Sequence, residues 1–433
     1  MLYRYGEKVS TMESRPLLLL QNVQLPDGRI ADITVKGGLV THRGSGTPAE
    51  RSIDCTGSFV LPAAVDMHVH MRGGSQSAKE DWQTGSRSAL AGGVTLVVDQ
   101  PNTLPPIVTP DTLHARVREA KSHSLCHFAI NSGVTSGTSL HEMWRAGAMA
   151  FGETFFAPSS YGNAISGGEL ENALAQIKSL EALATIHAEE VEPGFDTTLD
   201  SHRKIRSPEG ELRAVLAVLK RNTAEARLHF CHLSTRESVD AAAGSVEVTP
   251  HHLFLSAEQF PEDDARGKVN PPLRSERERK ALLSRWQRID VIASDHAPHT
   301  RDEKHQSFGD APAGIPGVET MMPVLVAEVM KKTMSLEDVI RKTSFAPAKI
   351  LGINPPGFVP GSRGDFAVYP KKMVKISADT LHSRCGWTPF EGRPGVFPDI
   401  VIMGGSVVFE EGEFFKANPV WIPGEGYRPP GIS

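Results

Sequence analysis

Short apolar runs alternate with amphipathic stretches through the middle of the chain, and this repeat limits the possible fold more than any other feature. The eight runs cover residues 60–69, 94–99, 125–130, 148–152, 184–187, 228–232, 246–249 and 289–294. Helical periodicity lies between most of them, as over 111–122, 169–183, 209–221 and 275–287. Strands that alternate with helices form parallel sheets, because each parallel connection must cross the sheet.

Eight such units over roughly 250–290 residues predict an α/β fold, a (β/α)8 TIM barrel. A doubly wound open sheet is the competing architecture, but no GxGxxG sequence opens the first unit. Short β-like segments precede residue 58 and follow residue 353. We expect the barrel to span residues 59–352, and residues 14–58 and 353–433 to form one small β-sandwich beside it.

Composition narrows the class of protein. The 433 residues carry a net charge of −5, with 39% hydrophobic and 22% charged residues, as in a soluble globular protein. The mild charge argues against a nucleic-acid partner. No apolar stretch is long enough to span a membrane. The four cysteines are scattered without a CxxC pair, which favours reduced thiols and a cytoplasmic location: Cys55, Cys126, Cys231 and Cys385.

Histidine and acidic residues stand at the ends of the apolar runs. His68, His70 and Arg72 alternate at the end of the first run, so they share one face of a strand. Four further residues follow later runs: Glu153, His187, His232 and Asp295. Because barrel active sites lie at the carboxyl ends of the strands, we expect all these side chains to meet. Imidazoles and carboxylates gathered in one site are typical of a metal centre.

The pattern fits a two-metal hydrolase. His68, His70 and Asp295 would hold one ion. His187 and His232 would hold the other, with Glu153 as the bridging carboxylate. We expect two zinc ions per chain, with a single ion as the alternative, although cobalt and manganese suit the same ligands. Asp295 would take a proton from the attacking water and pass it to the leaving nitrogen.

Nine phrases of the sequence resemble the long-chain bacterial and archaeal dihydroorotases of the amidohydrolase superfamily. They are HVHMR (68–72), KEDW (79–82), AGGVT (91–95), QPNT (100–103), TPHHL (249–253), KVNPPLR (268–274), SDHAPH (294–299), GIPGVET (314–320) and WTPFEG (387–392). The resemblance covers essentially the full length of the chain. The HxH pair alone would indicate only the superfamily.

The resemblance implies reversible hydrolysis of (S)-dihydroorotate to N-carbamoyl-L-aspartate in pyrimidine biosynthesis. The substrate carboxylate needs a fixed cation, which the planar guanidinium of Arg72 can supply. Asn102 and His299 match the family's other contacts to the carboxylate. Asn270 and the backbone at Gly314 match its contacts to the ring. The family also implies a small-molecule substrate, a homodimer and association with aspartate carbamoyltransferase.

Glu153 departs from the family pattern. Many dihydroorotases carry a lysine here, which carbon dioxide converts to a bridging carbamate. Glutamate offers the same charge and two oxygens on a shorter side chain, and residues 149–160 contain no lysine. Either the backbone lies closer to the metals, or the second ion is held weakly.

Two alternatives remain open. The first is a cyclic amidohydrolase for another substrate, such as an allantoinase, hydantoinase or dihydropyrimidinase. An anionic substrate explains Arg72 better than those substrates do. The second is a non-catalytic chain that only supports a partner subunit, and such a chain would be expected to lose metal ligands.

The remaining histidines are expected to have structural roles. We expect packing or supporting roles for His251, His252 and His296. No function is predicted for three others: His127, His202 and His229. The segment 194–208 is a candidate lid loop over the substrate.

Overall fold

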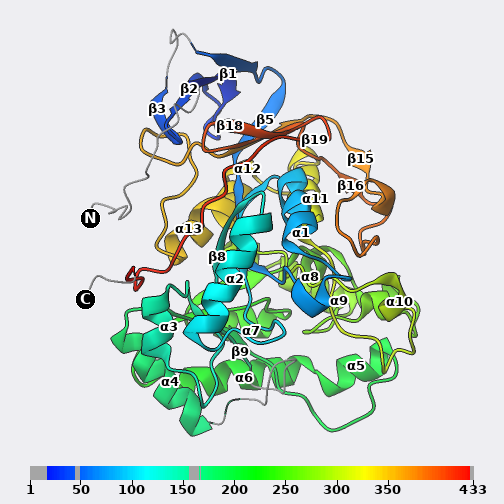
Figure 1. Cartoon of the computed structure of the whole chain (residues 1–433). Coiled ribbons are helices and arrows are strands. Elements are labelled where there is room, and N and C mark those ends of the chain that lie inside the picture. Colours follow the sequence, from blue (N-terminus) through cyan, green and yellow to red (C-terminus); the bar gives the residue numbers. More distant parts are fainter. Residues whose placement is uncertain (1–16, 44–48, 156–164, 166, 430–433) are drawn as a thin grey trace.

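The computed structural model describes residues 17–43, 49–155, 165 and 167–429. Parallel strands form the centre of the molecule (Figure 1). They are β6 (Ala64–Val69), β7 (Val94–Asp99), β8 (His127–Ile130), β9 (Phe151–Phe155), β10 (Leu183–His187), β11 (Arg227–Phe230), β12 (Ser245–Val248) and β13 (Val291–Ile292). This content confirms the predicted α/β class.

The parallel strands follow one another in chain order. One sheet has the order β6-β7-β8, and a second runs from β9 to β13. Parallel bridges join the two sheets at both sides, between Ser132 and Phe151 and between Val69 and His296. Neighbour contacts therefore lead from β6 through every strand to β13 and back to β6. The carboxyl ends of these strands point in one direction.

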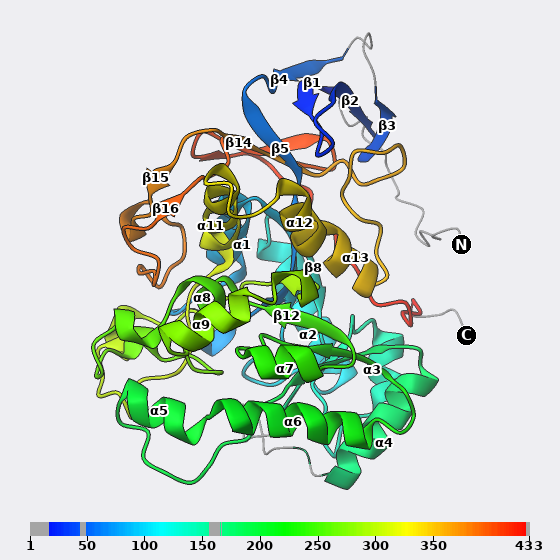
Figure 2. The same ribbon diagram turned by 180° about the vertical axis from the view of Figure 1, so that it is seen from behind.

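Helices connect these strands and pack around them. They are α1 (Trp82–Gly92), α2 (Pro110–His123), α3 (Leu140–Ala146), α4 (Gly167–Ser179), α5 (Leu199–Ile205), α6 (Pro208–Arg221), α7 (Arg236–Ala241), α8 (Pro250–Phe254), α9 (Glu276–Leu283), α10 (Arg301–Lys304), α11 (Val318–Met330), α12 (Leu336–Ile340) and α13 (Ala346–Ile350). From behind, α5 and α6 lie on the side of the molecule opposite β1–β4 (Figure 2). In the part of the chain that the structure describes, no helix could cross a membrane.

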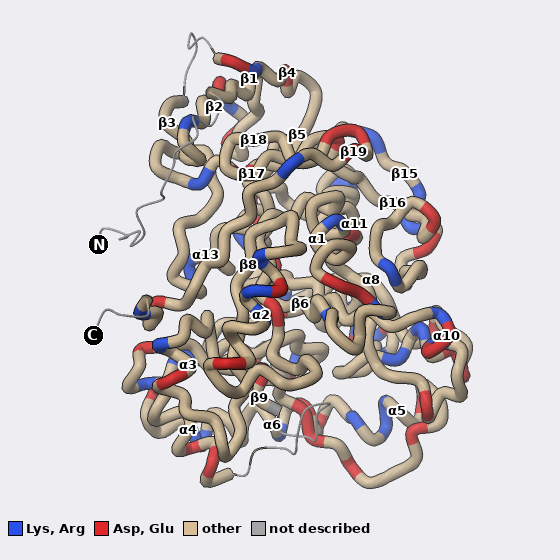
Figure 3. The backbone as a smooth tube through the Cα atoms, viewed as in Figure 1, with Lys and Arg blue, Asp and Glu red and all other residues tan. Residues whose placement is uncertain are grey.

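Local sequence explains where the helices begin. In α2, Thr109 and Thr112 form a capping box, and Pro110 occupies the first turn. Leu113, Val117 and Ala120 are buried at helical spacing. One stripe of α2 therefore faces the strands, while the rest of the helix faces solvent. Basic and acidic residues are interspersed along the backbone tube (Figure 3).

Two further sheets are built from the ends of the chain, and the second of them combines both ends. One has the order β3-β2-β1-β4, built from β1 (Leu18–Gln24), β2 (Ile30–Lys36), β3 (Leu39–Arg43) and β4 (Arg51–Asp54). The other has the order β19-β18-β17-β14-β5, built from β5 (Ser58–Pro62), β14 (Phe366–Pro370), β17 (Ile400–Met403), β18 (Ser406–Glu410) and β19 (Glu413–Phe414). A short ladder pairs β15 (Val374–Lys375) with β16 (Pro394–Gly395).

The predicted strand 60–69 is divided in the structure. Its first part, β5, pairs antiparallel with β14, and its second part, β6, pairs parallel with β7. Ala63 separates them, and its N–H donates to the carbonyl of Asp365 at 3.0 Å. Because both parts are buried, the apolar pattern alone could not reveal the break. The expected domain boundary at residue 59 therefore falls inside β5.

Other predicted elements are shortened or shifted. The eighth run, 289–294, forms a strand only over Val291–Ile292. The helix expected over 275–287 ends at Leu283 and is followed by a 3-10 turn at Trp286–Arg288. The strand expected over 148–152 instead covers Phe151–Phe155, which places Glu153 inside it.

Tyr369 of β14 joins the second sheet to the parallel strands. Its side chain is fully buried, and its hydroxyl donates to the carbonyl of Gly92 at 3.1 Å. We expect Tyr369→Phe to lower the free energy of unfolding by about 1 kcal/mol, because the carbonyl loses a buried partner. Chemical denaturation measures this change. Tyr427→Phe, at a half-buried ring, is the control, and an equal loss there would contradict the assignment.

Candidate metal centre

The predicted metal ligands meet at the carboxyl ends of the parallel strands. His68 and His70 come from the end of β6, and Glu153 lies in β9. His187 ends β10, while His232 and Asp295 follow β11 and β13. All six side chains are buried. Their approach follows from parallel pairing, because residues just past neighbouring strands share one edge.

Glu153 lies between the histidines. Its Oε1 is 3.0 Å from Nδ1 of His187 and 2.9 Å from Nε2 of His232. Its Oε2 is 3.6 Å from Nε2 of His68. On the opposite side, Oδ1 of Asp295 lies 3.1 Å from Nε2 of His70 and 3.5 Å from Nε2 of His68. One carboxylate thus connects two groups of imidazoles.

The donor atoms fit divalent metal ions. His68, His70 and Glu153 offer three ligand atoms within 4.8 Å of one another, and Glu153, His187 and His232 offer a second such set. Nε2 of His68 is buried without a hydrogen-bond partner, as expected of an atom that faces a metal. Imidazole nitrogen and carboxylate oxygen are the ligands of catalytic zinc sites.

Gly152 allows β9 to lie close to β10. A Cβ atom at this position would lie 2.1 Å from the carbonyl oxygen of Thr185, and the residue has a φ of +137°. Only glycine fits there without moving the strand. The close strand contact places the next residue, Glu153, against His187 and His232. A backbone that lies closer to the metal site is one of the two possibilities given above for the shorter side chain of Glu153.

Three acceptors fix the imidazole rings from behind. Nδ1 of His68 donates to Glu247 at 3.1 Å, and Nδ1 of His70 donates to the side-chain oxygen of Asn102 at 2.7 Å. Nε2 of His187 donates to Glu189 at 3.1 Å. In each case the other ring nitrogen is left for the centre, as in metal sites generally.

Glu247 and Glu189 also support the centre, although neither was predicted to do so. Both are fully buried, and Glu247 also accepts from the backbone N–H of His232 and from Nε2 of His229. For Glu247 the available signal was an acid within an apolar strand, because buried carboxylates need several donors. His229, for which no function was expected, thus holds Glu247 in place.

Paired charges keep the buried acids ionised. Burial raises the pKa of Glu153, but His68, His187 and His232 outweigh it and hold the pKa well below its usual range. Burial lowers the pKa of His187, but Glu153 and Glu189 raise it overall to about 9. Burial opposes ionisation of Asp295 too, yet His70 and His68 hold its pKa low. Ionised carboxylates are the form that binds metal.

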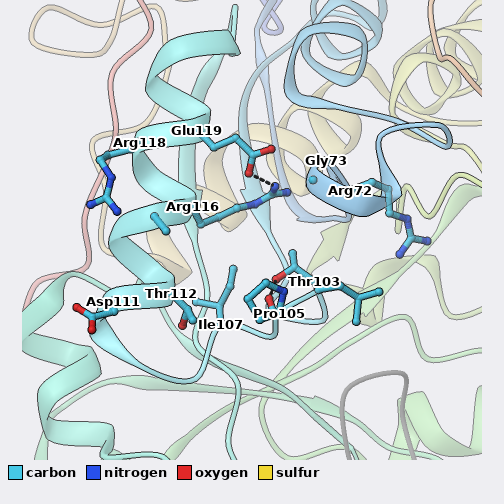
Figure 4. Close-up of a pocket in the computed structure, with 13 residues that line it drawn as sticks. Arg72, Gly73, Thr103, Pro105, Ile107, Asp111, Thr112, Arg116, Arg118 and Glu119 are labelled. Carbon is cyan, nitrogen blue, oxygen red and sulfur yellow. Dashed lines mark hydrogen bonds and ion pairs between the residues drawn. The ribbon is translucent and has the colours of Figure 1, made fainter.

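Arg72 and His299 lie together beside the centre. Arg72 is 8% exposed, its Nε donates to the carbonyl of Pro298 at 3.3 Å, and its Nη2 lies 3.3 Å from Nε2 of His299. Burial lowers the pKa of Arg72 to about 10, so the side chain stays charged at neutral pH. Arg72 also lines a cavity of about 410 Å³, together with Thr103 and Arg116 (Figure 4).

The backbone of Gly314 lies beside Lys268 and His299. The N–H of Gly314 donates to the carbonyl of Lys268 at 3.0 Å, two residues before Asn270. A Cβ at Gly314 would lie 2.9 Å from the ring of His299, so its backbone touches that side chain. The side-chain oxygen of Asn270 is buried without a hydrogen-bond partner. The structure therefore brings Gly314 and Arg72 against His299. Asn102 is also near the centre, with its oxygen on His70.

Two of the three histidines expected to have supporting roles make hydrogen bonds that suit such roles, whereas Nε2 of the third, His251, has no hydrogen-bond partner. Nδ1 of His296 accepts from the N–H of Gly317 at 3.1 Å. His252 lies 2.8 Å from the hydroxyl of Thr249 through Nδ1 and donates through Nε2 to the carbonyl of Pro271. Burial holds the pKa of His251 well below its usual range, so this ring is neutral.

The expected lid loop contains a helix instead. Residues Leu199–Ile205 form α5, which Thr198 and Ser201 cap. His202 is buried and bonds Asp196 and the carbonyl of Val269. The segment 194–208 is therefore a loop only outside α5, and its role as a lid stays a prediction.

Comparison with known proteins adds an independent result. The model of the amidohydrolase family matches residues 59–383. The dihydroorotase of Methanosarcina acetivorans is 40% identical, over 92% of this chain and 93% of the relative. The dihydroorotase of Halobacterium salinarum is 39% identical, over 90% and 96%. Among solved structures, the L-hydantoinase (dihydropyrimidinase) from Arthrobacter aurescens has a TM-score of 0.84 and 26% identity, over 94% of this chain and 99% of that one.

Substitution of Gly152 tests the close strand contact. We expect Gly152→Ala to lower bound zinc and activity roughly tenfold, because the new methyl group pushes Glu153 away from the histidines. Metal analysis after dialysis measures the effect. Gly168→Ala is the matched control, since nothing lies within 4 Å of a Cβ there. Equal zinc content in both variants would contradict the role given to Gly152.

The buried ammonium group of Lys304 should make the free energy of unfolding depend on pH. It is 3% exposed, and its ammonium donates to the carbonyls of Lys268 and Pro312. Burial lowers its pKa from 10.5 to about 7. Between these values the unfolded chain binds more protons than the folded one, so stability rises with pH.

We expect the free energy of unfolding of Lys304→Met to rise by about 2 kcal/mol less than that of the wild type between pH 7 and 10. Denaturation of the zinc-loaded protein across this range measures it, with Lys331→Met as the control for an exposed lysine. An unchanged slope in Lys304→Met would show that the residue does not titrate there.

Proposed function

The chain belongs to the amidohydrolase family, and we propose that it is a dihydroorotase that reversibly hydrolyses (S)-dihydroorotate to N-carbamoyl-L-aspartate. It acts as a hydrolase of a cyclic amide in pyrimidine biosynthesis. The observation that carries this function is the identity of 40% to a dihydroorotase over 92% of the chain. The buried pair of Arg72 and His299 beside the candidate metal centre supports it.

We assign two divalent ions, taken to be zinc, to the buried centre. His68, His70 and Asp295 would hold one ion, and His187 and His232 the other. Glu153 would bridge them in place of a carboxylated lysine. Ions held there lower the pKa of water and polarise the scissile carbonyl. The contacts of Glu153 with three imidazoles support the bridging role.

Asp295 is the proposed proton carrier. Its carboxylate is 5% exposed and lies beside His70 and His68. Because these histidines hold its pKa low, Asp295 is ionised and can accept a proton from the attacking water. It then donates this proton to the ring nitrogen that leaves. In the reverse direction the same carboxyl group acts in the opposite order.

Arg72 favours a substrate with a carboxylate over the uncharged substrates of related cyclic-amide hydrolases. Dihydroorotate carries a carboxylate, whereas hydantoin and dihydrouracil carry none. A buried guanidinium next to the centre would remain unpaired with those substrates, and unpaired buried charges are costly. We therefore assign Arg72, Asn102 and His299 to the substrate carboxylate, and Asn270 and the backbone of Gly314 to the ring.

The same proposal includes a barrel, a β-sandwich and the assembly of the protein. The closed neighbour relations of β6 to β13 support a (β/α)8 barrel, and the two terminal sheets support a β-sandwich beside it. Membership in the long-chain type, a homodimer, association with aspartate carbamoyltransferase and a cytoplasmic location remain predictions.

Turnover by the zinc-loaded protein tests the function. We expect conversion of L-dihydroorotate in both directions, and a loss of roughly 1,000-fold in Asp295→Ala, because that variant lacks the proton carrier. Asp302→Ala, on the exposed surface of α10, is the control and should keep full activity.

Metal analysis should give two zinc ions per chain. One ion per chain at full activity would contradict the bridged centre but leave the reaction intact. No turnover by protein that retains its zinc would contradict the dihydroorotase assignment. Hydantoin and allantoin would then be the substrates to test.

A further inference from the structure

The turn after β6 holds Arg72 in an unusual backbone conformation. The strand ends at Val69, and Arg72, three residues later, has a φ of +49°. This is the left-handed region, which residues other than glycine rarely adopt. Such a conformation persists only where the surrounding structure fixes it. The contacts that fix the backbone at Arg72 therefore also determine where its guanidinium lies.

Backbone N–H groups on both sides of Arg72 are held. The N–H of Gly73 donates to the carbonyl of Glu80 at 3.0 Å. The N–H of Met71 donates to Oδ1 of Asp99 at 2.8 Å. Of these two contacts, only the one at Met71 depends on a side chain. A substitution of Asp99 can therefore remove it.

Asp99, at the end of β7, has a donor on each of its carboxylate oxygens. Its Oδ2 accepts from Nε of Arg116 at 2.7 Å, while Oδ1 accepts from Met71. Both side chains of this ion pair are buried, and the guanidinium carbon of Arg116 lies 4.8 Å from the ring centre of Trp82. Because Arg116 holds one oxygen, the other stays directed at the N–H of Met71.

Arg116 also lies against the turn itself. A Cβ atom at Gly73 would lie 3.0 Å from Nη1 of Arg116, and this nitrogen donates to Glu119 at 2.8 Å. Arg116 reaches from α2 toward Gly73, whereas the guanidinium of Arg72 points away from α2 (Figure 4). The ion pair therefore acts on the backbone of the turn and leaves the guanidinium of Arg72 to its own contacts.

We propose that Asp99 is a positioning residue that holds the backbone at Met71 and thereby directs the guanidinium of Arg72 toward the substrate carboxylate. The guanidinium itself has long contacts, at 3.3 Å to the carbonyl of Pro298 and 3.3 Å to the ring of His299. Its place thus depends on the backbone that carries it, and bidentate binding tolerates little displacement. The carboxylate as ligand rests on the proposed function, whereas the backbone contact does not.

Two double variants isolate the contact. Removal of Asp99 alone would leave a buried cation unpaired, so both members of the ion pair are replaced together. Asp99→Asn/Arg116→Met keeps a side-chain oxygen that can accept from Met71. Asp99→Leu/Arg116→Met has nearly the same shape without that oxygen. Because both variants lack the ion pair, a difference between them reports the acceptor for Met71.

The first measurement observes Met71 directly. Zinc-loaded protein labelled with ¹⁵N-methionine gives the spectrum of the methionine amides, and Met71→Leu assigns the signal of Met71. We expect its amide hydrogen to exchange roughly tenfold faster in Asp99→Leu/Arg116→Met than in Asp99→Asn/Arg116→Met. Equal exchange in the two variants would overturn the proposal, even if dihydroorotate is not the substrate.

The second measurement is turnover of L-dihydroorotate. We expect KM to be roughly tenfold higher in Asp99→Leu/Arg116→Met than in Asp99→Asn/Arg116→Met, with kcat values within about threefold. Equal KM values would overturn the proposal. No turnover by the wild type would instead contradict the proposed function, and amide exchange would still decide the contact of Asp99.

Zinc content separates Arg72 from the metal centre. The N–H of His70 donates to the carbonyl of His296 at 2.8 Å and does not depend on Asp99. We therefore expect equal zinc content in the two double variants. A loss of zinc confined to Asp99→Leu/Arg116→Met would place the effect at the ligands and would overturn the proposal.

Removal of Arg72 tests whether Asp99 acts through it. When each double variant also carries Arg72→Met, we expect their kcat/KM values to differ less than about twofold. A difference that stays near tenfold would show that Asp99 acts only through the fold, and would overturn the proposal. Should the double variants fail to fold, Asp99→Glu keeps the charge beside Arg116 but displaces the carboxylate by one methylene. An unchanged KM in Asp99→Glu would then contradict the role of Asp99.

Discussion

The shared carboxylate of Glu153 is the interaction on which the rest of the site depends. It lies against His68, His187 and His232, which come from three different strands. A buried carboxylate with three imidazoles is stable only when each charge or dipole has a partner. Glu247 and Glu189 meet this need for His68 and His187 by binding their rings from behind. The candidate metal centre is therefore one connected polar network inside an apolar core.

The position of β9 brings Glu153 into that network. The strand that carries Glu153 lies unusually close to β10, because Gly152 leaves no room for a Cβ beside Thr185. The backbone position that Gly152 allows thus brings the Glu153 carboxylate to the imidazoles.

Sequence reasoning located the strands and the residues at their ends but not the contacts between distant segments. His68, His187 and Asp295 could be placed because each follows an apolar run, and the order of parallel strands then brings them together. The break at Ala63 could not be predicted, since the residues on both sides of it, Val60, Leu61, Ala64 and Val65, are all buried and apolar. Glu247 was missed because its partners, His68 and His229, come from other strands.

The division of one apolar run into β5 and β6 has a consequence for how the protein is made. During synthesis, β6 and its two histidines emerge early, but β14, the partner of β5, emerges near the end of the chain. The stretch directly preceding the ligands must therefore wait unpaired until almost the whole polypeptide has left the ribosome. Domains generally fold as units during synthesis, and this one can close its sheet only afterwards. A chain truncated before Phe366 would retain every candidate ligand yet leave β5 exposed as an unpaired edge.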